Sequence, residues 1–230
     1  MAISGQAVWL GVGVDYASAL ALQHSLCADR AEGRTSDTLL LLEHAPVYTA
    51  GRRSLDEHVL GALPAPLVES DRGGQTTYHG PGQLVGYPIL ALTGLGMGPR
   101  AYVRALEGAL IAALAGWGVQ AWREEGLTGV WTDGGKIAAM GVRVSRGVAM
   151  HGFALNVTTD LGAYGPIIPC GIADRPVTSL AALTGAPPPM TTVRAGVTAH
   201  LGEALGIAWA EREPGAVGWP RGDGVARNPR

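Results

Sequence analysis

Residues 136–157, KIAAMGVRVSRGVAMHGFALNV, place the strongest constraint on the fold, because their pattern is that of two strands joined by a tight turn. The two apolar halves, 136–145 and 148–157, are separated only by Arg146 and Gly147. A two-residue loop joins antiparallel strands, and glycine supplies the positive φ that such turns need. The stretch therefore predicts a long β-hairpin.

The rest of the chain contains both strand and helix patterns. Strands are expected at 7–14, 38–44, 64–70 and 207–213, and helices at 15–31, 99–116 and 191–206. Asp15 is a suitable N-cap for the first helix, and Pro99 is a suitable first residue for the second. Residues 71–92 are expected to form a loop, a short strand, a turn at 80–82 and another strand. Because strands outnumber helices without alternating regularly, the pattern indicates the α+β class.

The length and composition indicate one globular domain. A chain of 230 residues can bury one good core, and 47% hydrophobic with 16% charged residues is a globular composition. The segment 214–230 is rich in Gly, Pro and Arg. We expect one domain over residues 1–213 and a flexible tail over 214–230.

Charge and hydropathy disfavour several classes of protein. The net charge is −2 and no basic run exceeds Arg52-Arg53, which gives no general attraction to nucleic acid. There is no apolar window of 18 residues, and the N-terminus lacks the basic residues of a signal peptide. We therefore expect a cytoplasmic protein, with no membrane partner, in which Cys27 and Cys170 are reduced thiols.

Lys136 is the one lysine among 17 basic residues, and it follows a Gly-Gly turn. A composition biased toward arginine explains a lone surface lysine without any function. Alternatively, the position requires an amine, because a partly buried lysine can release its proton whereas arginine cannot.

Cys170 lies between Pro169 and Gly171, where a loop or the end of an element is expected. Functional side chains are enriched on loops, whereas Cys27 falls inside a predicted helix, where a structural thiol is usual. An ammonium beside a thiol favours the reactive thiolate. A pair of Cys170 and Lys136 would thus supply a nucleophile and a proton carrier, although an inert buried Cys170 also fits the sequence.

The six histidines show no zinc-like spacing with cysteine or carboxylate, so no metal is expected. His44 ends a predicted strand, and His79 and His151 fall in Gly-rich segments where they could line a cleft. The glycines of 71–83, DRGGQTTYHGPGQ, would let a ligand approach the backbone. No GxxxxGK[ST] phosphate loop is present in the sequence.

Four stretches together resemble the octanoyltransferases of lipoate biosynthesis, and the resemblance spans about residues 7–205. They are LLLLEHAPVYTAGRR (39–53), DRGGQTTYHGPGQLVGYPIL (71–90), KIAAMGVRVSRGVAMHGFALNV (136–157) and IIPCGIADRPVTSL (167–180). Two residues depart from the family pattern: Ala45 stands where proline is common, and Tyr164 where phenylalanine is usual.

The resemblance implies a single α+β domain like the catalytic domain of biotin and lipoate protein ligases, with mixed sheets flanked by helices. It implies an enzyme that moves an octanoyl group from octanoyl-acyl carrier protein to lipoyl domains. These acceptors are 2-oxoacid dehydrogenase E2 subunits and the glycine cleavage H protein. We expect no cofactor, because the donor thioester is already activated, and a monomer is the default expectation. Cys170 matches the family's acyl-thioester nucleophile, and Lys136 matches the residue that activates it. The acyl-binding positions match Arg72, Gly73, Gly74, Gln75, Thr76, Thr77, Tyr78, His79, Ala139, Met140, Gly141, Gly152, Phe153 and Ala154.

Other functions on the same sequence stay open. An ATP-dependent lipoate–protein ligase would use Lys136 to bind an acyl-adenylate and would not need Cys170. An amidotransferase would take its acyl group from another carrier protein, and a non-enzymatic module would bind carriers without forming an acyl-cysteine. A cysteine hydrolase, with His79 or His151 as its base, would release free acid.

Overall fold

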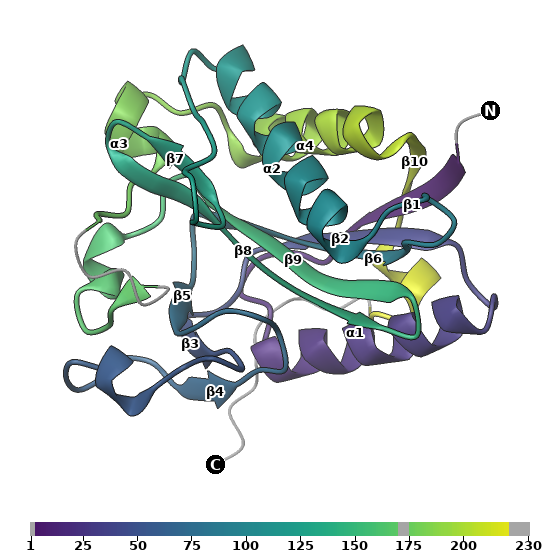
Figure 1. Cartoon of the computed structure of the whole chain (residues 1–230), viewed down its shortest axis with the longest axis horizontal. Helices are drawn as coiled ribbons and strands as arrows, with labels where there is room; N and C mark the ends of the chain where they lie inside the picture. The colour runs from purple at the N-terminus through teal and green to yellow at the C-terminus, as the bar shows by residue number, and fades with distance from the viewer. Residues whose placement is uncertain (1–2, 170–174, 221–230) are drawn as a thin grey trace.

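The computed structural model describes residues 3–169 and 175–220 (Figure 1). In these ranges a seven-stranded sheet has the order β10-β1-β2-β6-β9-β8-β7, and a three-stranded sheet has the order β4-β3-β5. The larger sheet comprises β1 (Ile3–Trp9), β2 (Asp37–Leu42), β6 (Gln83–Ala91), β7 (Val130–Thr132), β8 (Gly135–Ser145), β9 (Val148–Asn156) and β10 (Ile207–Arg212). The smaller sheet comprises β3 (Val47–Ala50), β4 (Leu67–Glu69) and β5 (Thr77–His79). The helices are α1 (Tyr16–Ala31), α2 (Pro99–Gly116), α3 (Leu180–Thr184) and α4 (Met190–Leu205), with 3₁₀ turns η1 (Asp56–His58), η2 (Leu161–Tyr164) and η4 (Pro214–Val217).

The larger sheet is mixed. Strands β10, β1 and β2 run parallel, and the other neighbouring strands pair antiparallel. Helix α1 is the crossover between β1 and β2, which a parallel pair requires. It begins where the sequence predicts, because the Asp15 carboxylate accepts a 2.8 Å hydrogen bond from the backbone N–H of Ser18.

Helices cover both faces of the larger sheet, with α2 and α4 on one face and α1 on the other (Figure 1). Strand β2 explains why both faces are apolar. Its Leu39 and Leu41 belong to the core under α2 and α4, whereas Leu40 and Leu42 belong to the core under α1. A central strand buried on both faces therefore has a continuous apolar run instead of an alternating one.

The predicted hairpin is formed by β8 and β9. Ser145 pairs with Val148, and the turn residues Arg146 and Gly147 have φ of 49° and 77°. Two successive positive φ values are typical of the type I′ turn, whose twist matches that of antiparallel strands. Strand β9 of the hairpin pairs with β6, and β8 pairs with β7 on its other side. Because Ala138 pairs with Leu155, Lys136 lies near the C-terminal end of β9.

The expected α+β class, with mixed sheets flanked by helices, is confirmed. Helices α2 and α4 cover the predicted ranges to within one residue. Strands β3 and β7 and helix α3 have at most five residues and were not predicted, because such short elements show no periodicity. After residue 213, the turn η4 places Val217 in the core under α1, and residues 221–230 lie outside the described part.

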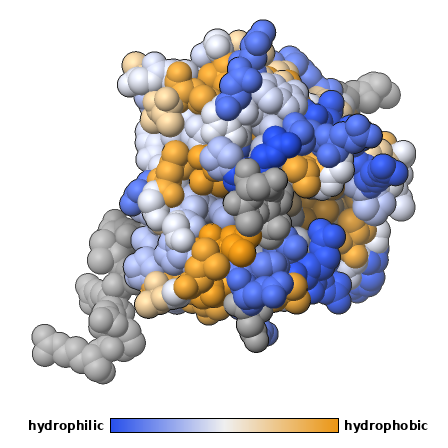
Figure 2. Space-filling model, turned by 60° about the vertical axis from the view of Figure 1, so that its left-hand side comes forward, coloured by the Kyte–Doolittle hydropathy of each residue, from blue (hydrophilic) through white to orange (hydrophobic). Residues whose placement is uncertain are grey.

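The surface beside the smaller sheet mixes hydrophilic and hydrophobic side chains (Figure 2). Among the described helices, none has the length and hydropathy needed to cross a bilayer.

Candidate functional site

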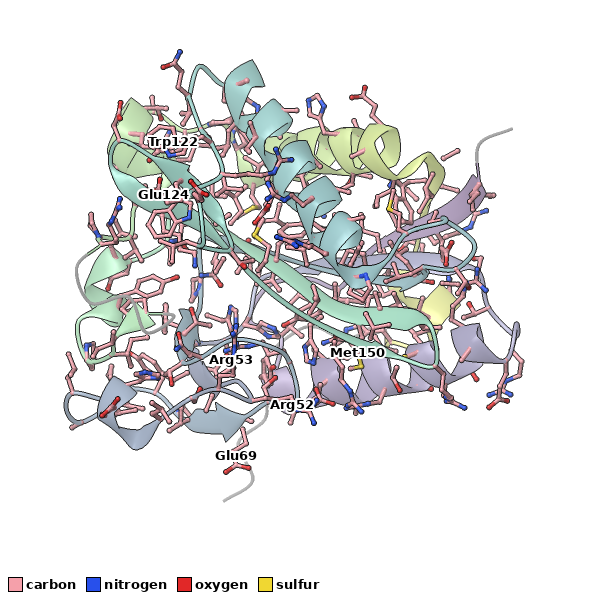
Figure 3. The ribbon with its side chains drawn as sticks, viewed as in Figure 1. Arg52, Arg53, Glu69, Trp122, Glu124 and Met150 are labelled. Carbon is pink, nitrogen blue, oxygen red and sulfur yellow. The ribbon has the colours of Figure 1, made fainter. Side chains whose placement is uncertain are left out.

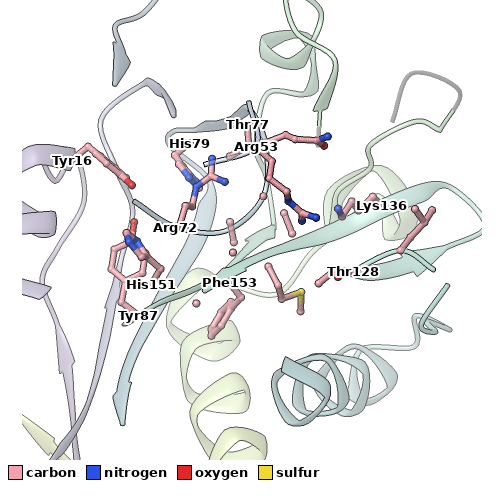
Figure 4. Close-up of a pocket in the computed structure, with 18 of the residues that line it drawn as sticks. Tyr16, Arg53, Arg72, Thr77, His79, Tyr87, Thr128, Lys136, His151 and Phe153 are labelled. Carbon is pink, nitrogen blue, oxygen red and sulfur yellow. The ribbon is translucent and has the colours of Figure 1, made fainter. Parts of the chain in front are cut away.

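A cavity of about 270 Å³ lies between the β8–β9 hairpin and the segment 72–79 (Figure 4). Lys136 and Arg53 lie at one end of it, and Tyr16, Tyr87 and His151 lie at the other. Most of the predicted site residues line this cavity. They are Arg72, Gly74, Gln75, Thr77, His79, Lys136, Ala139, Met140, Gly141, His151, Gly152, Phe153 and Ala154.

The remaining predicted residues surround the cavity without lining it. Gly73 lines an adjoining groove, and Thr76, Tyr78 and His44 are buried behind the wall. Cys170 lies outside the described residues.

Lys136 is the second residue of β8, and its side chain is only 6% exposed. Its Nζ lies 5.4 Å from the centre of the Trp131 ring, within the range of a cation–π contact. The backbone N–H of Lys136 donates to Pro176 O at 2.9 Å, and its carbonyl accepts from Thr178 N at 3.0 Å. The lysine is therefore held by the chain that follows residue 174.

The chain before residue 170 also reaches Lys136. Pro169, Val177 and Lys136 line one small hollow together with residues of β8 and β9. The described residues on both sides of 170–174 thus lie beside the Lys136 side chain.

Arg72 braces the segment that forms the cavity wall. Its guanidinium donates to the carbonyl and to the hydroxyl of Thr49 on β3, at 2.8 and 2.7 Å. Gly73 N–H donates to Val142 O of β8 at 3.0 Å, which joins the two sides of the cavity. A Cβ on Gly141 would lie 2.9 Å from Gly73 O, so this close approach requires glycine.

Two neutral histidines are packed around the far end of the cavity. His44 Nδ1–H donates to Val14 O at 2.8 Å, and the Tyr87 hydroxyl donates to His44 Nε2 at 2.7 Å. Burial lowers the pKa of His44 to about 4. Burial, followed by the nearby His44 and Arg72, lowers the pKa of His79 to about 3. Both rings are therefore uncharged hydrogen-bonding groups at neutral pH.

His79 is held by a network of amide and hydroxyl groups. Its Nδ1–H donates to Gln83 Oε1 at 2.7 Å, while Gln83 Nε2 donates to Asn156 Oδ1 at 2.9 Å and to the Tyr164 hydroxyl at 3.0 Å. Tyr164 is one of the two positions that depart from the family pattern. Its hydroxyl therefore joins the network that orients His79.

His151 has an unusual backbone for a residue in the middle of a strand, with φ of 57°. Ala149 and Phe153 of β9 belong to the core under α2 and α4, and strict alternation would place His151 with them. Its ring instead packs edge-on against Tyr87 and donates from Nε2 to Asp71 Oδ1 at 2.6 Å. The left-handed conformation thus turns this side chain toward α1.

Asp71 collects several positive or polar partners at that end of the cavity. Besides the His151 ring, Arg143 pairs with one of its oxygens, and His24 Nε2 lies 3.3 Å away. Burial raises the pKa of Asp71, but the hydrogen bond from His151 and the charge of Arg143 outweigh it and lower the pKa overall. Burial lowers the pKa of His151 to about 4 despite the carboxylate.

Within residues 3–169 and 175–220, no three side chains of His, Cys, Asp or Glu are grouped as metal ligands would be. Sequence reasoning missed several lining residues from other elements, namely Tyr16, Arg53, Tyr87, Gly126, Leu127 and Thr128. Two glycines in EGLTGV (125–130) were the available sign that a ligand or side chain approaches this segment.

Comparisons with known proteins agree with this architecture. The model of the lipoyl protein ligase A/B catalytic domain matches residues 15–202. A structure described as lipoate-protein ligase A bound with ATP superposes with a TM-score of 0.71 at 18% identity, covering 92% of this chain and 89% of that one. A bipartite lipoate protein ligase of Thermoplasma acidophilum gives a TM-score of 0.71 at 17% identity, covering 97% and 100%. At such identities the likeness shows the fold alone.

Much closer sequence relatives are octanoyltransferases. The octanoyltransferase of Geobacter metallireducens is 52% identical over 188 residues, which are 82% of this chain and 88% of the relative. That of Mycolicibacterium gilvum is 52% identical over 206 residues, covering 87% and 78%. The chain therefore belongs to the lipoyl protein ligase A/B catalytic domain family and, within it, to the octanoyltransferases, which are acyltransferase enzymes.

Proposed function

We propose that the protein moves an octanoyl group from the thioester of octanoyl-acyl carrier protein to a lysine of a lipoyl domain, through a thioester on Cys170. The observation that carries this proposal is the position of Lys136. It is buried at one end of the cavity, and the chain on both sides of the segment with Cys170 lies beside it. Pro169, which lines the hollow at Lys136, is bonded directly to Cys170.

In the first step, the Cys170 thiol transfers its proton to the Lys136 amine, and the thiolate attacks the thioester carbonyl. The carbon–sulfur bond to the carrier then breaks, and Lys136 returns the proton to the leaving thiol. In the second step, the amine of the acceptor lysine attacks the acyl-cysteine, Lys136 takes its proton, and the Cys170 sulfur leaves with that proton. An amide is more stable than the thioester it replaces, so no nucleotide is consumed.

The cavity walls suit an unbranched acyl chain. Ala139, Met140, Phe153 and Ala154 supply apolar surface along the two strands of the hairpin. Burying about six methylenes at about 0.8 kcal/mol each stabilises the bound chain by about 5 kcal/mol. One methylene changes this only modestly, so neighbouring chain lengths should be tolerated.

The acceptors in this proposal are the lipoyl domains of 2-oxoacid dehydrogenase E2 subunits and the glycine cleavage H protein. The structure of the Thermoplasma acidophilum ligase is described together with its E2 lipoyl domain, which supports a lipoyl domain as the acceptor on this fold. The proposal also includes a cytoplasmic monomer with its catalytic domain over residues 1–213.

The test is to mix the protein with octanoyl-acyl carrier protein, without ATP or acceptor, and to weigh the intact chain by mass spectrometry. We expect one octanoyl adduct on Cys170 that moves to an added lipoyl domain. Cys170→Ser should form no thioester, whereas the matched variant Cys27→Ser should still form it, because Cys27 is buried in α1.

Other outcomes would identify a different enzyme. Modification of the acceptor only with free octanoate and ATP would indicate a ligase. Release of free octanoate without an acceptor would indicate a hydrolase, and tight binding of carriers without any adduct would indicate a binding module. Each of these results contradicts the proposed transfer.

A further inference from the structure

A second hollow, of about 360 Å³, adjoins the cavity and forms a groove along one face of α2. The two hollows share Arg53, Gly74, Met140, Gly141 and the segment 126–128. A molecule extending out of the cavity past Thr128 therefore enters this groove. In Figure 3, Arg53 comes from the side of the smaller sheet and Glu124 from the segment beside β7, so parts of the chain far apart in sequence form it.

The groove is rich in arginine although the whole chain carries a net charge of −2. Arg100 and Arg104 are one turn apart on α2, Arg53 follows β3, and Arg123 precedes β7. All four arginines are exposed at the surface.

Neither of the two carboxylates in the groove is paired with Arg53, Arg100 or Arg104. Glu107 is paired with Arg123, Nε to Oε2 at 3.3 Å, and it also accepts from Gly129 N at 3.0 Å. Glu124 is paired with Arg175 and accepts from Trp122 Nε1.

Three positive charges of the groove are consequently not neutralised. Over residues 3–169 and 175–220, no ion pair includes Arg53, Arg100 or Arg104. Guanidinium groups bind phosphate by paired, charge-assisted hydrogen bonds, more strongly than neutral donors do. The groove therefore offers three guanidinium groups that can bind an anion of the phosphate type.

We infer that this groove binds the phosphate ester of the donor's phosphopantetheine arm, with Arg100 and Arg104 as its main contacts. The inference rests on the proposed function, in which the donor thioester reacts beside Lys136. The arm that carries the leaving sulfur bears a phosphate at its far end, whereas an acceptor lysine brings only an apolar stem and an amine. The donor arm, and not the acceptor lysine, therefore supplies a phosphate that can pair with these arginines.

The test compares octanoyl-pantetheine with octanoyl-4′-phosphopantetheine as minimal donors in single-turnover transfer. The phosphorylated donor should reach its half-maximal rate at a concentration lower by about tenfold or more, because charge-assisted hydrogen bonds to phosphate contribute on that scale. The double variant Arg100→Gln/Arg104→Gln should lose this difference while still using octanoyl-pantetheine. Arg34→Gln, which removes an exposed arginine paired with Asp29, is the matched control and should keep the difference.

A binding measurement separates this inference from the transfer reaction. In calorimetric titrations, 4′-phosphopantetheine should bind the wild-type protein more tightly than pantetheine, and the double variant should bind both equally. Equal binding by the wild-type protein would overturn the inference even if Cys170 becomes acylated. If ATP binds with the same dependence on Arg100 and Arg104 and 4′-phosphopantetheine does not, the groove is a nucleotide site. If octanoyl-acyl carrier protein also fails to acylate the protein, the proposed function fails, and the assignment of the donor arm fails with it.

Discussion

The Lys136 side chain lies directly against the backbone of Gly129, so closely that a Cβ on Gly129 would be 2.4 Å from Lys136 Cε. The same Cβ would lie 2.8 Å from Ala138 O, which cannot move without disturbing β8. Gly129 has φ of 135° and donates its N–H to the buried Glu107 carboxylate at 3.0 Å. Glycine at this position therefore determines where the amine of Lys136 lies.

We predict that Gly129→Ala lowers the rate of acyl transfer by about tenfold or more, because a displacement of about 1 Å near the reacting groups is costly. The variant should also lose about 1–3 kcal/mol of stability, since alanine is strained at this φ. Single-turnover kinetics and chemical denaturation measure the two effects.

Gly118→Ala is the control for backbone strain. Gly118 also has a positive φ, 77°, but a Cβ there would meet nothing within 4 Å. It should lose a similar amount of stability and keep normal transfer. Equal activity of the two variants would show that Gly129 does not position Lys136.

Replacing Lys136 with arginine should lower transfer by about 100-fold or more, the usual contribution of a general base, because a guanidinium does not release its proton. The folded state should persist, as judged by circular dichroism. Lys136→Ala should be equally slow, and added ethylamine should partly restore its rate. Near-normal turnover of Lys136→Arg would exclude a proton-transfer role.

The free energy of unfolding should begin to fall as the pH drops below about 6.5, which is well above the pH at which carboxylates titrate. Burial lowers the pKa of His44, His79 and His151 to about 4, 3 and 4, whereas in the unfolded chain they titrate near 6.5. Below pH 6.5 the unfolded state binds more protons, so stability is complete above this pH and falls toward pH 4. Each histidine contributes a slope of up to about 1.4 kcal/mol per pH unit.

Urea denaturation at several pH values measures this slope. His79→Asn, which can keep a donor for Gln83, should make the slope shallower. A free energy of unfolding that is constant between pH 7 and pH 5 would contradict the prediction.

The backbone of His151 can be tested by two substitutions that both remove the hydrogen bond to Asp71. Asparagine tolerates a left-handed φ, whereas a β-branched residue does not. His151→Val should therefore be less stable than His151→Asn by about 1–3 kcal/mol. Equal midpoints in urea would show that the conformation at residue 151 carries no strain.

The sequence by itself predicted the elements that depend on local pattern. The hairpin follows from two apolar runs around Arg146-Gly147, and the start of α1 follows from Asp15, because turns and caps involve residues a few positions apart. The resemblance to the octanoyltransferases, carried by motifs in the sequence, also pointed to Lys136 and to three of the segments that line the cavity. The role of Cys170 stays a prediction, since it lies outside the described residues.

The tertiary structure decided how these elements meet. The parallel pairing of β10, β1 and β2, the bond between His151 and Asp71, and the contact of Gly129 with Lys136 join residues with no shared local pattern. The arginines of the groove are likewise distributed over three separate segments, and only packing of α2 against the sheet brings them together. A local sequence pattern determines the conformation of one segment. The site depends instead on which surfaces are buried against each other, and this arrangement is determined only when the whole core is packed.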